Sequence, residues 1–155
     1  VFTQTWDWNV VWASLPYVMG VTTVIFRKHI DKIKIDREKM IRTLPVVLGE
    51  KASRYVVLGM MVAPYLFVLA LIATQYFTPV MALVLLAIPS LKEVFPAFLQ
   101  PKPDQRPEEF PEGNGGWPLY FAPLAFVNNR AFGMYFMAGL VLDVILRNIF
   151  PTFWV

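Results

Sequence analysis

Two carboxylates, Asp31 and Asp36, lie in a charged stretch that runs from Arg27 to Glu50, directly after an apolar segment. Mg²⁺ takes few protein carboxylates and completes its coordination shell with water and phosphate oxygens. Nearby Arg and Lys side chains neutralise the remaining phosphate charge. Two carboxylates among basic residues at a membrane surface therefore suit a Mg²⁺ ion that bridges to a diphosphate.

The spacing of the two carboxylates also allows a simpler interpretation. Side chains five residues apart on a regular helix diverge by about 140°, so they converge only if the helix ends between them. Arg27 with Asp31, and Lys32 with Asp36, are each spaced i, i+4, which is the spacing of ion pairs on a solvated helix face. By spacing alone, a solvated charged face is the favoured interpretation.

Three other polar features could carry chemistry. His29, the only histidine, could accept a proton near neutral pH, although a capping or interfacial position at a helix end is the favoured interpretation. Asp143 and Arg147 are spaced i, i+4, which predicts an ion pair near the outer membrane surface. The run Asn128 to Arg130, on the same side as Asp31 and Asp36, is expected to cap a helix or to face a shared polar cavity.

The composition is that of an integral membrane protein. Hydrophobic residues make up 57% of the 155 residues and charged residues only 16%, whereas a soluble domain carries about 25% charged residues. The absence of Cys excludes disulfides, thiolate catalysis and Cys-ligated metals. A membrane span needs about 20 apolar residues. Residues 1–155 therefore predict one all-α integral membrane domain with about four transmembrane helices, at about 8–26, 55–76, 80–95 (with a break near Pro89) and 124–150.

The distribution of basic residues predicts the orientation in the membrane. Short cytoplasmic loops carry an excess of Lys and Arg. The 27–54 loop is rich in them, whereas the turn around 75–79 has none. We therefore expect the 27–54 loop, and with it the Pro-rich loop 98–120, to face the cytoplasm across an inner (cell) membrane.

The run from Asp36 to Gly49, DREKMIRTLPVVLG, strongly resembles the second aspartate-rich motif of the UbiA superfamily of intramembrane prenyltransferases. In that family an Asp-containing segment is followed by a stretch similar to D-R-x-x-G-x-R-T-L-P-V-x-L-G. The segments 117–119 and 129–133 also resemble stretches of bacterial members. The resemblance covers nearly the whole chain and corresponds to the C-terminal half of the family's nine-helix bundle.

The resemblance implies a function. Members transfer a prenyl group from a prenyl diphosphate to an aromatic, quinone-type or related acceptor, as in quinone biosynthesis, and two aspartate-rich loops bind Mg²⁺ and the diphosphate. By this resemblance, Asp31 and Asp36 would bind Mg²⁺, and Arg37, Lys39 and Arg42 would contact the diphosphate. The implied partners are the lipid bilayer and a prenyl diphosphate, with no nucleic acid. No residue is assigned as catalytic.

The sequence departs from the family pattern in three places. The N-D-x-x-D run of the first motif is absent, the spacing from Asp31 to Asp36 is one residue longer than D-x-x-x-D, and Met40 stands where Gly is common. We therefore expect the C-terminal half of a prenyltransferase, inactive as this fragment alone. The alternative is a non-catalytic accessory subunit of the same fold, packed against a larger photosynthetic or respiratory membrane complex. A third hypothesis, that the chain is a lipid-binding or transporter fragment, is supported only by the basic loop.

Overall fold

The computed structural model describes residues 6–108, 110 and 117–150. In chain order its helices are α1 (Trp8–Asp31), α2 (Ile33–Glu38), α3 (Leu44–Leu48), α4 (Glu50–Ala73), the 3₁₀ helix η1 (Pro79–Ala87), α5 (Ile88–Val94), the 3₁₀ helix η2 (Phe95–Phe98) and α6 (Phe121–Ile149). Within this part of the chain, four segments are long and apolar enough to cross a membrane, namely α1, α4, Pro79–Phe98 and α6. The predicted all-α membrane fold is confirmed.

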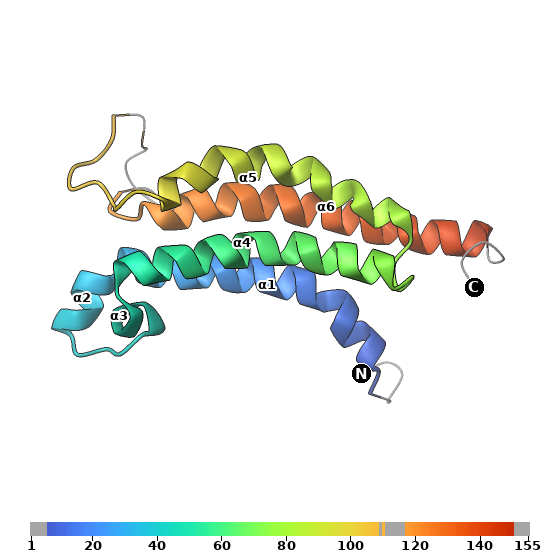
Figure 1. Cartoon of the computed structure of the whole chain (residues 1–155), viewed down its shortest axis with the longest axis horizontal. Helices are drawn as coiled ribbons and strands as arrows, with labels where there is room; N and C mark the ends of the chain where they lie inside the picture. Colours follow the sequence, from blue (N-terminus) through green and yellow to red (C-terminus); the bar gives the residue numbers. More distant parts are fainter. Residues whose placement is uncertain (1–5, 109, 111–116, 151–155) are drawn as a thin grey trace.

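The four long segments lie side by side in a bundle (Figure 1). The start of α1 and the end of α6 lie at one end, together with the turn between α4 and η1. The short helices α2 and α3 lie at the other end, together with the segment that joins η2 to α6. The two polar segments of the sequence therefore meet at a single end of the bundle, which we call the α2–α3 end.

One stripe of α1 faces the other helices. Its buried residues recur at alternating spacings of four and three, as one face of a helix requires: Pro16, Gly20, Thr23, Arg27 and Ile30. At Gly20 an added Cβ would lie 2.5 Å from Asn129 Oδ1 of α6. A small residue is thus needed where α1 and α6 approach, as is common between membrane helices. Much of the remaining surface of α1 is exposed and apolar, which suits contact with lipid.

The third membrane-spanning segment changes its helix type midway. It begins as η1 and becomes α-helical between Ala87 and Ile88, with Pro89 in the first turn of α5. Proline has no N–H to donate to the preceding turn, and the helix type changes at this position. The predicted break near Pro89 is thus a change from 3₁₀ to α geometry, and the span itself is not interrupted.

A polar clamp fixes the end of the bundle opposite α2 and α3. Asp143 Oδ2 accepts from Arg147 Nε at 2.9 Å, and its Oδ1 accepts from the backbone N–H of Thr78 at 2.6 Å. Arg147 Nη2 also donates to the carbonyl oxygen of Tyr76 at 2.7 Å. The predicted Asp143–Arg147 ion pair is confirmed, and its partners show that it holds the turn between α4 and η1 against α6.

The helix boundaries differ from the predicted ones where charged residues continue a helix. α1 extends to Asp31 instead of ending near residue 26, and α4 begins at Glu50 instead of 55. Lys, Arg and Glu are good helix formers, so hydropathy falls before the helix ends. The predicted 27–54 loop accordingly contains α2, α3 and the first turn of α4. The third and fourth segments run from 79 to 98 and from 121 to 149.

Candidate functional site

Asp31 binds the N-terminus of α6. Its Oδ1 accepts from the backbone N–H groups of Tyr120 and Phe121 at 3.0 and 3.1 Å, and its Oδ2 accepts from Ala122 at 2.9 Å. The first N–H groups of a helix lack intrahelical partners, and the helix dipole favours a negative charge beside them. The carboxylate of Asp31, whose side chain is 0% exposed, therefore caps α6 from the last residue of α1.

Lys102 strengthens this junction from the segment between η2 and α6. Its Nζ lies 3.8 Å from Asp31 Oδ1 and 5.1 Å from the centre of the Trp117 ring, and it donates to the carbonyl oxygen of Pro118. The backbone N–H of Lys102 donates to Glu50 Oε1 at 3.1 Å. The Pro-rich segment is thereby tied to both α1 and α4.

Asp36 has a different environment from Asp31. It lies in α2, and its Oδ2 is 3.5 Å from His29 Nδ1 of α1, the one hydrogen bond or ion pair of its side chain with the described residues. The side chain of Asp36 is 10% exposed. The i, i+4 pairs expected from the spacing, Arg27 with Asp31 and Lys32 with Asp36, are absent from the described contacts because these carboxylates have other partners.

The three predicted diphosphate contacts lie on the surface of the α2–α3 end. Arg37, Lys39 and Arg42 are all exposed, and none of their side chains forms a hydrogen bond or an ion pair with the described residues. Because these side chains have no such partner, they are available to form charge-assisted hydrogen bonds with a phosphate ligand. All three follow Asp36 within six residues of the sequence, whereas Asp31 lies in a separate contact with α6.

The residues fit Mg²⁺ only in part. Among the described residues no group of three or more His, Asp or Glu side chains could hold a metal ion. Both oxygens of Asp31 accept backbone hydrogen bonds, so Asp31 does not fit as a metal ligand. Asp36 fits as a single carboxylate ligand, with water and phosphate oxygens completing the shell.

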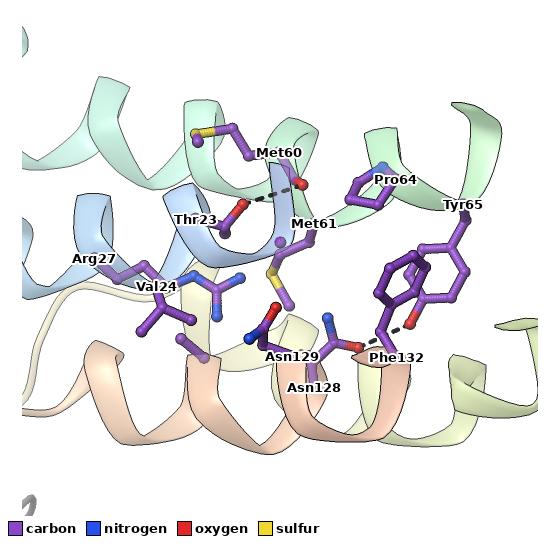
Figure 2. A pocket seen from close by; sticks show the side chains of 12 residues that line it. Thr23, Val24, Arg27, Met60, Met61, Pro64, Tyr65, Asn128, Asn129 and Phe132 are labelled. Carbon is purple, nitrogen blue, oxygen red and sulfur yellow. Dashed lines mark hydrogen bonds between the residues drawn. The ribbon is translucent and has the colours of Figure 1, made fainter. Parts of the chain in front are cut away.

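The interior of the bundle holds a polar cluster around Arg27, whose burial the sequence analysis did not anticipate (Figure 2). Arg27 is 1% exposed and lines a cavity with Asn128 and Asn129. The expectation that the run Asn128 to Arg130 faces a polar cavity therefore holds for the two asparagines, whereas Arg130 is exposed. Arg54 is also buried and donates to the carbonyl oxygen of Phe98 at 3.3 Å. One signal in the sequence could have indicated that Arg27 is buried. It lies four residues after Thr23 and seven after Gly20, on the helix face that carries the small residues of α1.

A model of the UbiA prenyltransferase family matches residues 1–110. The chain belongs to this family. No curated protein and no solved structure matches it. The matched region of this UbiA-family chain contains α1 to η2 and includes the whole Asp36–Gly49 run.

The family pattern also explains one backbone feature of the run. Met40, which stands where the family commonly has Gly, has a φ of 57° and is 89% exposed. A left-handed backbone is costly for a residue with a Cβ and free for glycine. The turn after α2 thus has the conformation that glycine favours, although the residue here is Met.

Proposed function

We propose that the protein acts as a UbiA-type prenyltransferase component, with the α2–α3 end binding the diphosphate of a prenyl diphosphate during transfer to an aromatic, quinone-type or related acceptor. The observation that carries the proposal is the family match over residues 1–110. The exposed cations of the Asp36–Gly49 run lie at the end of the bundle where a membrane-embedded prenyl chain would present its charged head.

The described side chains have distinct parts in this proposal. Arg37, Lys39 and Arg42 would neutralise the diphosphate and so stabilise it as a leaving group. Asp36 would hold Mg²⁺, which supplies further charge neutralisation when bound. Asp31 and Lys102 would position the start of α6 beside this surface. We also propose that this end faces the cytoplasm of an inner (cell) membrane, because the basic residues are concentrated there.

Diphosphate binding tests the proposal directly. Geranyl diphosphate would be titrated into the purified chain in a non-ionic detergent, with and without Mg²⁺. We expect saturable binding that Mg²⁺ strengthens. The combined variant Arg37→Gln, Lys39→Gln and Arg42→Gln should bind about tenfold or more weakly, because three phosphate-facing charges are lost.

The matched control removes three other exposed cations from the same chain, in the combined variant Lys51→Gln, Lys92→Gln and Arg130→Gln. It has the same net charge and should bind geranyl diphosphate like the wild type. Equal weakening of both variants would show only non-specific attraction. Absence of binding by the wild type would contradict the proposal and favour the accessory-subunit alternative.

A further inference from the structure

Arg27 is a buried cation without a counter-charge among the described residues. Two of its guanidinium nitrogens, Nε and Nη1, are fully buried and form no hydrogen bond within this part of the chain. The guanidinium lies over the ring of Phe98, with 4.5 Å between Cζ and the ring centre. A cation–π contact offsets only part of the cost of removing a charge from water. This position therefore requires another group that accepts hydrogen bonds.

No carboxylate of the described residues supplies that group. Asp31, one turn further along α1, directs both oxygens to the N-terminus of α6. Asp36 contacts His29, and Asp143 lies in the clamp at the opposite end of the bundle. An ionisable side chain inside a membrane bundle is generally paired or binds a ligand.

A cavity lies beside the guanidinium, between α1, α4 and α6 (Figure 2). The amides of Asn128 and Asn129 face the same space as Arg27. Asn128 Oδ1 accepts from Tyr65 Oη at 3.0 Å and lies 3.5 Å from Ser90 Oγ. Because its oxygen is occupied, the amide of Asn128 has its N–H₂ group left as a donor for a guest in the cavity.

The size and lining of the cavity limit what it can take. Its empty volume is about 260 Å³ including the part open to the outside, and its interior has room for a single guest of about the size of a water molecule. Apolar side chains of Val24, Met60 and Phe132 form much of the remaining wall. A narrow space with a guanidinium, amide donors and apolar walls favours a small, singly charged anion over a strongly hydrated phosphate.

We propose that this cavity is a binding site for a monatomic anion of chloride size, which pairs with Arg27 and accepts from the amides of Asn128 and Asn129. The site is separate from the exposed cations proposed for the diphosphate, because its residues lie inside the bundle. The anion neutralises the buried guanidinium of Arg27 and thereby stabilises the packing of α1 against α4 and α6.

The test measures the thermal unfolding of the purified chain in a non-ionic detergent at constant ionic strength. Sodium chloride or bromide replaces sodium gluconate, whose anion is too large for the cavity. We expect the Tm to rise by about 3 °C or more, and to saturate with chloride, because a ligand that binds only the folded state stabilises it by mass action. Arg27→Gln should abolish the chloride-dependent rise, whereas Arg130→Gln, an exposed cation of α6, should retain it.

A second variant keeps the proposal testable if Arg27→Gln does not fold. Asn129→Asp places a carboxylate beside Arg27 in the cavity and removes an amide donor, so its Tm should exceed that of the wild type in gluconate and should no longer respond to chloride. Equal Tm values of the wild type in chloride and gluconate would show that the cavity holds only water and would overturn the proposal. A chloride response retained by Arg27→Gln or by Asn129→Asp would overturn it as well.

Discussion

Asp31 shows that an aspartate in a metal-binding type of motif can instead cap a helix. Its place in an aspartate-rich motif predicts a metal ligand, whereas its three backbone hydrogen bonds make it the cap of α6. Its partners lie 89 to 91 positions away in the sequence. No local pattern around Asp31 can indicate a contact at that separation, so only the folded chain reveals it.

Replacing Asp31 with Asn should destabilise the fold. The amide removes the negative charge from the start of α6 and directs an N–H₂ group toward backbone donors, so we expect a loss of about 1.5–3 kcal/mol. Denaturant unfolding in detergent measures it. Asp104→Asn, at an exposed carboxylate of the segment after η2, should have little effect. An unchanged stability of Asp31→Asn with lost Mg²⁺-dependent diphosphate binding would instead support the metal-ligand prediction.

Replacing Met40 with Gly should stabilise the turn after α2. The φ of 57° costs a residue with a Cβ about 1–2 kcal/mol, which is offset in part by the greater freedom of glycine in the unfolded chain. We expect a net gain of about 0.5–1 kcal/mol, measured by the same unfolding assay. The neighbouring Ile41→Gly has no such strain to relieve and should be neutral or destabilising. A loss of stability in Met40→Gly would contradict this explanation of the motif.

At the scale of helices, the inward stripe of α1 decides how the bundle packs. The segments that cross the membrane follow from hydropathy, because each must satisfy its backbone within itself and present an apolar surface. Their ends do not follow from hydropathy, since α1 and α4 both continue into charged residues. The close approach of α1 to α6 at Gly20 depends on Asn129, which is distant in the sequence.

Enlarging Gly20 should separate α1 from α6. The Cβ of Gly20→Val would meet Asn129 Oδ1, whereas a Cβ at Gly59 meets nothing within 4 Å. Both substitutions have the same intrinsic effect on a helix, so the difference between them reports packing alone. We expect Gly20→Val to be less stable than Gly59→Val by about 1–3 kcal/mol in thermal or denaturant unfolding. Equal stabilities would show that the α1–α6 contact is looser than described.

At the scale of the whole molecule, the bundle has one polar end and a clamped opposite end. The sequence predicted the four spans, the Asp143–Arg147 pair and the family, and it marked Pro89 as an irregular position, although the span there changes helix type instead of breaking. It did not predict the burial of Arg27, because a basic residue after an apolar segment is usually taken as the start of a loop. It also could not distinguish Asp31 from Asp36, which share a motif but have different partners.

The most direct measurement is hydrogen–deuterium exchange of the purified chain with geranyl diphosphate and Mg²⁺. We predict slower exchange in peptides covering residues 32–49, at the α2–α3 end, and unchanged exchange in peptides covering residues 74–79, at the opposite end. Methylene diphosphonate, which lacks the prenyl chain, should give weaker protection of the same peptides. Protection confined to residues 74–79, or none at either end, would contradict the assignment of the diphosphate to the Asp36–Gly49 run.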